Sequence, residues 1–433
     1  MTASLVETTR KRQLESKEAP GLSRRSSYVS HIRLENIRGF GPKFDLNLSS
    51  EEDGNARRRT LIIGQNGTCK TTLLRCIALS MCWREDANAL LAEQIGPIIA
   101  QDCEEGAIEV HLQRGRTKSV IRNRVARTRD RRDHFIGAGR ERNVRAKFPF
   151  ICAVGAGRSG EGADPYRSYQ VVDSVYSLFN YESTLTSVEL CLHRLRNFRI
   201  RGKLVYRPIM NCIKSALKLP PGARFELGDA GGVFISGSGL GRRIPLQAWA
   251  DGYMLTTSWI LDVYSWAMRA RAIIENGGID GIILVDEIEQ HIHPSMQMGL
   301  LGVLSTFWPA AQIFATTHSP LTALGAQPEE LVVLKRSSSG IELVKDPPDF
   351  TGYSVLEMLT DNRLFGSPGF RPEVKAQIEA YSSLSAKPKA ERTKAESKEL
   401  LQVSRKLMDA ELSKPAHTPL LRQLNELLAR HNL

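Results

Sequence analysis

The feature that most constrains this chain is a glycine-rich loop placed between an apolar strand and a helix. Residues 60–63 read as a short strand that ends at Gly64, and the loop Gly64–Thr72 follows it directly. Apolar residues recurring on one face from Lys70 onward predict a helix. A phosphate needs backbone N–H groups around it, a helix N-terminus aimed at it and a cation that reaches its outer oxygens. We therefore expect an α/β fold whose loop binds phosphate.

Within this loop, Lys70 is expected to reach the phosphates, and the Thr71 hydroxyl is expected to hold Mg²⁺. The residues assigned to phosphate binding are Gly64, Gln65, Asn66, Gly67, Thr68, Cys69, Lys70, Thr71 and Thr72. Cys69 departs from the usual pattern, which has its last glycine there. The extra Cβ would weaken binding, or its thiol would make binding sensitive to oxidation. The alternative is a chance glycine-rich turn.

A second signal is an apolar strand that ends in two carboxylates. Residues 281–285 form a continuous apolar run, typical of a strand buried on both faces of a parallel sheet. Asp286 is expected to hold Mg²⁺ through water, and Glu287 to orient or deprotonate the attacking water. The alternative is a solvated pair of acids, which is less common after four aliphatic residues.

A third strand, expected over 312–315, is followed by His318. If the strands are parallel, this residue lies at the same edge of the sheet as Glu287. Its imidazole can then hydrogen-bond the terminal phosphate and report its presence. A purely structural histidine is the alternative.

These motifs, in this order, resemble those of the ABC-class ATPases. Within them the chain is similar to the soluble RecF/SMC-like, bacterial AAA-like branch and to the ATPase subunits of Septu-type anti-phage defence systems. The resemblance is carried by Ile37–Phe40, Asp286–Pro294 and Thr317–Pro320, and it covers about residues 31–336. It implies an ABC-type head that binds ATP and Mg²⁺. Arg38 would lie near the nucleotide, and Glu287 and His318 would be catalytic.

In that family, a signature segment of one subunit caps the ATP bound by another, so that ATP joins two heads into a homodimer or a higher oligomer. Residues 246–253 occupy the corresponding place, and the contacts would come from Ala250, Asp251, Gly252 and Tyr253. Ala250 replaces the usual serine, and Met254 stands where arginine is common. The alternative is that Asp251 only caps a helix.

The distribution of charge is uneven. The chain has 59 Lys and Arg against 47 Asp and Glu, a net charge of +12. The segment Arg114–Lys147 holds thirteen basic and three acidic residues, a net +10. Such a segment can meet the phosphates of DNA or RNA, or an anionic surface. The alternative is the solvated face of a hairpin.

The expected organisation is a flexible basic tail over 1–30, the ATPase head over 31–336 and a mainly helical, peripheral region over 337–433. The head combines a mostly parallel core sheet, flanked by helices, with an antiparallel lobe that carries the basic segment. Nothing approaches the roughly 18 consecutive apolar residues of a membrane-spanning helix. Seven scattered cysteines without a CxxC pair favour a cytoplasmic location.

Several functions fit these features. The first is an ATP-driven switch that controls a separate nuclease or other effector in anti-phage defence. The second is a RecF-like DNA-repair accessory, and the third is a scaffold held together by ATP without hydrolysis. A transporter ATPase is disfavoured, because the signature lacks LSGGQ. About 180 residues separate Lys70 from the signature, too few for the long coiled coil of SMC proteins.

Overall fold

The computed structural model describes residues 27–50, 54–93, 96–136, 148–158, 161–162, 168–220, 222–228, 231–237, 243–248, 251–367, 372–388 and 391–411. Most of the expected tail, residues 1–26, lies outside them. The contacts divide the chain between Asp346 and Pro347 into two compact units. Each unit is described by itself.

The first unit contains a six-stranded sheet with the order β18-β17-β3-β16-β15-β7. All neighbouring strands in it run parallel except the β17–β18 hairpin, which confirms the mostly parallel core. The hairpin keeps residues beyond 336 in this sheet, so the head extends past the boundary expected there. The strands are β3 (Arg59–Gly64), β7 (Ile151–Val154), β15 (Gly281–Val285), β16 (Ala311–Thr317), β17 (Leu331–Ser337) and β18 (Gly340–Leu343).

A second, antiparallel sheet has the order β2-β1-β4-β5-β6 and contains the first part of the basic segment. This confirms the expected antiparallel lobe. The first strand begins at Tyr28, which pairs with Gln113 and is buried. The strands are β1 (Tyr28–Glu35), β2 (Phe44–Asn47), β4 (Glu105–Arg114), β5 (Thr117–Arg127) and β6 (Asp133–Phe135).

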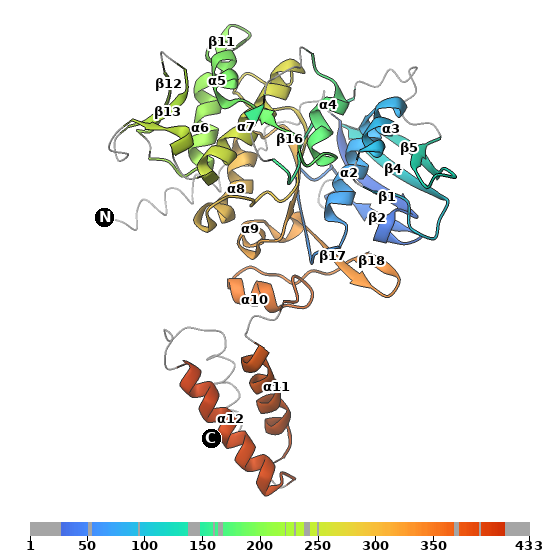
Figure 1. The fold of residues 1–433 in the computed structure, drawn as a ribbon, viewed down its shortest axis with the longest axis vertical. Coiled ribbons are helices and arrows are strands. Elements are labelled where there is room, and N and C mark those ends of the chain that lie inside the picture. Colours follow the sequence, from blue (N-terminus) through green and yellow to red (C-terminus); the bar gives the residue numbers. More distant parts are fainter. Residues whose placement is uncertain are drawn as a thin grey trace. The chain divides into compact units, whose positions relative to one another are not determined.

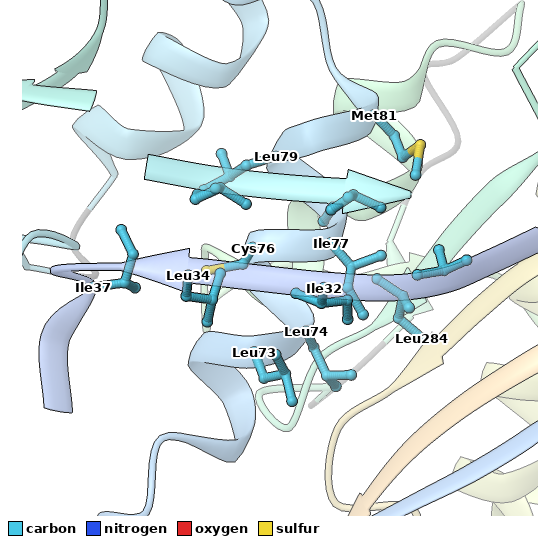
Figure 2. Packing of buried hydrophobic residues seen from close by; sticks show 14 of the residues in the cluster. Ile32, Leu34, Ile37, Leu73, Leu74, Cys76, Ile77, Leu79, Met81 and Leu284 are labelled. Carbon is cyan, nitrogen blue, oxygen red and sulfur yellow. The ribbon is translucent and has the colours of Figure 1, made fainter. Parts of the chain in front are cut away.

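Helix α2 (Lys70–Met81) follows the glycine-rich loop and packs against both sheets (Figure 1). Nearly all of its side chains are buried. Figure 2 shows Leu73, Leu74 and Ile77 of this helix close to Ile32 and Leu34 of β1. A single hydrophobic core therefore joins the two sheets through α2 and fixes the start of this helix against the parallel sheet.

The remaining helices of this unit are α3 (Arg84–Ala92), α4 (Val171–Val175), α5 (Val188–Arg196), α6 (Tyr206–Ala216), α7 (Asp251–Arg269), α8 (Pro294–Phe307) and α9 (Pro320–Leu324). Trp259 and Trp266 of α7 are buried in the core. The 3₁₀ turns in the described part of this unit are η1 (Arg38–Phe40), η2 (Tyr176–Leu178), η3 (Leu246–Ala248) and η4 (Pro328–Glu330).

Short strands complete the first unit. They are β8 (Glu161–Gly162) with β9 (Leu185–Thr186), β10 (Arg199–Ile200) with β11 (Lys203–Leu204), and a small sheet of β12 (Arg224–Leu227), β13 (Val233–Ser236) and β14 (Ile244–Pro245).

The second unit is helical in the part that the structure describes. It contains α10 (Val355–Thr360), α11 (Pro372–Ala386) and α12 (Lys394–Glu411). Helices α11 and α12 pack together around Tyr381, Leu384 and Leu400. Across the described residues of both units, no helix is long and apolar enough to span a membrane.

Candidate ATP-binding site

The site is built at the carboxyl ends of three neighbouring strands, β3, β16 and β15. The strands are parallel, with Thr317 opposite Ile63 and Val285 opposite Ala315, so their ends lie at one edge of the sheet. The residues that follow each strand therefore converge. This topology brings together the loop Gly64–Thr72, the carboxylates after β15 and His318, as the sequence predicts.

The loop after β3 needs glycine where it turns. Gly64 has φ +156°, and a Cβ there would lie 2.4 Å from the Leu334 carbonyl oxygen. Gly67 has φ +77°. The loop curls around Lys70, whose ammonium donates to the carbonyl oxygens of Gly64 (2.8 Å) and Gln65 (3.0 Å). The first N–H groups of α2 have no acceptor within their own helix and are free to bind an anion.

The Lys70 side chain is buried. Burial lowers the pKa of its ammonium to about 8, and the nearby Asp286 and Glu287 carboxylates oppose this shift. A partly desolvated cation at a helix start is a strong attractor for phosphate.

Cys69 shows why this position is usually glycine. Its φ of 61° and ψ of 25° place it in the left-handed region, where an L-residue costs roughly 1–2 kcal/mol. Its sulfur faces η1, since a Cβ on Gly39 would lie 3.1 Å from it. The thiol is thus partly buried beside the loop and packs against the core.

Thr71 and Asp286, which the sequence assigns to Mg²⁺, lie in direct contact. The Thr71 hydroxyl donates to Asp286 Oδ2 at 2.8 Å, and the Thr316 hydroxyl donates to Oδ1 at 2.6 Å. A hydroxyl and a carboxylate are oxygen ligands of the kind that Mg²⁺ prefers, so this pair fits the ion. The sequence reasoning missed Thr316, although its place two residues before His318 on a strand end was a usable signal.

Glu287 is held in an unusual backbone conformation, with φ +47°. Its N–H donates to Thr316 Oγ1 at 2.8 Å, and its carbonyl accepts from Arg158 at 2.6 Å. Burial and the Asp286 charge raise the pKa of the Glu287 carboxyl. A raised pKa suits a group that accepts a proton from water.

Arg158 supports the backbone of both acidic residues. Its guanidinium also donates to the Asp286 carbonyl at 2.9 Å, and the side chain is only 1% exposed. Burial lowers its pKa to about 10. Arg158 therefore braces the strand end that carries the acids.

His318 lies close to the charged groups of Lys70 and Asp286. Burial and the Lys70 charge lower the pKa of its imidazole, which favours the neutral ring. Its backbone N–H donates to Glu289 Oε1 at 2.6 Å. The sequence reasoning gave Glu289 no role of its own, and only its place two residues after Glu287 pointed to it.

Arg38 lies next to the first turn of α2. Its guanidinium donates to Thr72 Oγ1 at 3.3 Å and to the Pro97 carbonyl at 2.7 Å. It lines a cavity of about 560 Å³. Burial, and then the charge of Arg75, lower its pKa. Arg38 therefore adjoins the phosphate loop, as the resemblance implies.

The signature-like segment, of which residues 246–248 and 251–253 are described, leads into helix α7. Asp251 starts α7 and is exposed, and Gly252 packs against the loop after β15. A Cβ on Gly252 would lie 2.1 Å from the His291 carbonyl oxygen. Ala250 lies outside the described residues. Gly252 is thus required for packing within the chain, whatever else it contacts.

Several basic side chains of the segment Arg114–Lys147 already have partners within the protein. Arg122 pairs with Glu109 at 2.6 Å, and Arg124 pairs with Glu105 at 2.5 Å. Arg127 is almost buried and binds Asp133 together with the carbonyl oxygens of Ile99, Ala100, Gln101 and Cys103. The expectation that Arg127 belongs to a phosphate-binding face is therefore wrong, because its guanidinium is used in the fold. Residues 137–147 lie outside the described residues.

Two family models match the chain. One is described as an AAA domain and matches residues 31–150. The other is described as an AAA domain, putative AbiEii toxin, type IV TA system, and matches residues 265–324. Together they contain the phosphate loop, the acidic strand end and His318.

Three relatives are similar in sequence. The Septu protein PtuA of Bacillus mycoides (strain KBAB4) is 23% identical over 378 residues, which are 86% of this chain and 50% of that protein. The Septu protein PtuA of Bacillus thuringiensis is 36% identical over 95 residues, 20% of this chain and 24% of that protein. The Retron Vc95 probable ATPase of Vibrio cholerae serotype O1 biovar El Tor is 29% identical over 105 residues, 24% of this chain and 20% of that protein. The chain spans half or less of the length of each relative.

Among solved structures, the SMC head domain from Thermotoga maritima aligns with a TM-score of 0.43 and 10% identity, over 73% of this chain and 97% of that chain. An Smc head bound to the C-terminal winged-helix domain of ScpA aligns with a TM-score of 0.44 and 13% identity, over 73% of this chain and 96% of that chain. In its strand-end motifs and in its sequence, the chain is thus similar to P-loop ATPases with AAA domains and to the Septu protein PtuA.

Proposed function

We propose that the chain binds ATP with Mg²⁺, hydrolyses it and uses the cycle as a switch. The observation that carries this proposal is the 2.8 Å contact between Thr71 Oγ1 and Asp286 Oδ2, which joins the phosphate loop to the acidic strand end. Lys70 and the N-terminus of α2 bind the phosphates. Thr71 and Asp286 hold Mg²⁺, which neutralises phosphate charge when bound.

The hydrolytic step depends on Glu287. Its side chain orients the attacking water and takes its proton, while Arg158 and Thr316 hold its backbone in place. His318 hydrogen-bonds the terminal phosphate, and the loss of that phosphate breaks this hydrogen bond. The raised pKa of the Glu287 carboxyl supports this assignment, because a stronger base accepts the proton more readily.

The switch acts through dimerisation of two heads. Asp251 is exposed at the start of the 19-residue helix α7, and the N-terminus of such a helix can face the ATP bound by a second head. Ala250, Asp251, Gly252 and Tyr253 are the proposed contacts. Gly252→Ala is a poor probe, because a Cβ would collide with the chain's own His291 carbonyl. Asp251→Trp is better, because it blocks the surface without entering the core.

The test measures the molecular size of the protein and the identity of its bound nucleotide in one experiment. The protein is incubated with Mg²⁺ and ATP, separated by size and extracted to identify the bound nucleotide. Wild type should elute as a monomer with ADP, and Glu287→Gln as a dimer with ATP. Asp251→Trp added to Glu287→Gln should keep ATP but remain monomeric, with Asp130→Trp as the surface control. Wild type that retains only ATP would support the non-hydrolysing scaffold instead.

The biological output proposed is control of a separate nucleic-acid-directed effector, such as a nuclease, in anti-phage defence. The sequence similarity to the two Septu PtuA proteins and to the retron ATPase supports it. The alternative is a RecF-like repair accessory. A co-purified nuclease activity that depends on this chain would favour defence, whereas DNA binding without such a partner would favour repair.

Direct contact with nucleic acid is proposed through the exposed turn that carries Arg129, Arg131 and Arg132. Replacing these three by Gln should lower the DNA affinity. It should also make the slope of log affinity against log salt concentration less steep, by the equivalent of about three phosphate contacts. Arg127 must be left intact, since its loss would disturb the fold. An unchanged affinity and salt slope would mean that this turn is only the solvated end of a hairpin and does not contact DNA.

A further inference from the structure

Glu289 connects two loops that come from different strands. It lies in the turn after β15, and its Oε1 accepts the backbone N–H of His318, which follows β16, at 2.6 Å. No other side chain among the described residues is recorded as accepting this N–H. The link runs directly between the turn that carries Glu287 and the residue proposed to sense the terminal phosphate.

The other oxygen of this carboxylate is unusual. Glu289 Oε2 is buried and has no hydrogen-bond partner among the described residues. A buried carboxylate oxygen without a partner costs stability. The Glu289 charge also acts on Lys70, Glu287 and His318, so the carboxylate lies inside the same charged centre.

We propose that Glu289 is a positioning residue, which holds the main chain of His318 so that the imidazole faces the terminal phosphate of ATP. This inference rests on the proposed function. The hydrogen bond sets the position of the loop after β16 relative to Glu287. Glu289 thereby couples the residue that activates water to the residue that reports the phosphate.

The chain offers a matched control on the same loop. The Ser319 hydroxyl donates to Gln297 Oε1 at 2.6 Å, which ties this loop to helix α8. Gln297 is a tether next to His318, but it does not bind the His318 backbone. If any tether of this loop suffices, loss of Gln297 and loss of Glu289 should have the same effect.

The experiment compares Glu289→Ala, Glu289→Gln and Gln297→Ala in the full chain, with kcat and KM for ATP as readouts. Glu289→Ala should lower kcat about tenfold or more while KM changes less than about threefold, because ATP is held by the phosphate loop. Glu289→Gln keeps an acceptor oxygen and should recover most of kcat. Gln297→Ala should stay within about twofold of wild type in both constants.

Hydrogen exchange gives a readout that does not need turnover. The amide of His318 should exchange faster in Glu289→Ala than in wild type, and stay protected in Glu289→Gln and Gln297→Ala. If wild type releases no phosphate, the proposed function fails, and exchange at His318 still decides whether Glu289 holds this loop. Unchanged exchange in Glu289→Ala overturns the inference. So does a loss of kcat that Gln297→Ala reproduces and Glu289→Gln does not rescue.

Discussion

The two sheets of the head use charge in opposite ways. In the antiparallel sheet, Arg33 lies directly opposite Asp45, and Arg122 directly opposite Glu109, and both pairs form salt bridges. In the parallel part of the six-stranded sheet, the charged groups of the site instead follow strands β3, β15 and β16, at one edge. The comparison shows that the same residue types neutralise one another where register places them side by side. They are left to act on a ligand where parallel strands end together.

The largest expected effect comes from removing one lysine from each region. Lys70→Ala should weaken ATP binding by about 100-fold or more, because the loop loses its phosphate cation. Lys118→Ala, on the exposed face of β5, should leave ATP affinity within about twofold, since it lies on the antiparallel sheet. Titration with a fluorescent ATP analogue measures both. Equal affinities for the two variants would break the comparison.

The second expected effect is on stability and compares two arginines. Arg158→Ala should lower the free energy of unfolding by about 3 kcal/mol. The substitution removes the hydrogen-bond donor of the Asp286 and Glu287 carbonyls and leaves a cavity. Arg122→Ala removes an exposed surface pair and should cost less than about 1 kcal/mol. Urea denaturation followed by circular dichroism provides both values. A similar loss for the two arginines would contradict the different roles assigned to them.

A third prediction concerns pH. The pKa of Lys70 is lowered to about 8 in the ligand-free site, so the ammonium begins to lose its proton above that pH. ATP needs the protonated form, so binding then takes up a proton. The titration of Lys70 should therefore make the affinity fall up to about tenfold per unit of pH above 8, and should add no pH dependence below it, where the ammonium stays protonated. Lys70→Arg keeps its charge and should remove this dependence, which calorimetry at several pH values can follow.

The smallest expected effect is at Cys69. Cys69→Gly relieves the left-handed backbone, but it also adds freedom to the unfolded chain, so stability should rise by less than about 1 kcal/mol. ATP affinity should be equal or higher, and sensitivity to hydrogen peroxide should disappear. Cys69→Val should destabilise the loop, because a β-branched residue fits this conformation poorly. Thermal unfolding with and without ATP separates these outcomes.

The sequence predicted the parallel sheet and most of its site because strand-end motifs are local. Gly64–Thr72, Asp286, Glu287 and His318 each sit directly after an apolar run, and parallel strands bring such ends together. The supporting residues were harder to find. Arg158, Thr316 and Glu289 act through backbone groups far from them in sequence, and no local pattern reveals such a bond. The prediction for Arg127 failed because the basic composition of its segment suggests an exposed cation. In the fold, its partners are backbone carbonyls of residues 99–103 and the Asp133 carboxylate.

The central claim is that the edge of the parallel sheet is a catalytic ATP site. It is tested most directly by steady-state phosphate release from purified protein with Mg²⁺ and ATP, with and without duplex DNA. Glu287→Gln serves as the blank, and Glu373→Gln, an exposed glutamate of α11, as the matched control. We predict saturable release by wild type and Glu373→Gln that is absent from Glu287→Gln and altered by DNA. Phosphate release by Glu287→Gln at the wild-type rate would contradict the claim.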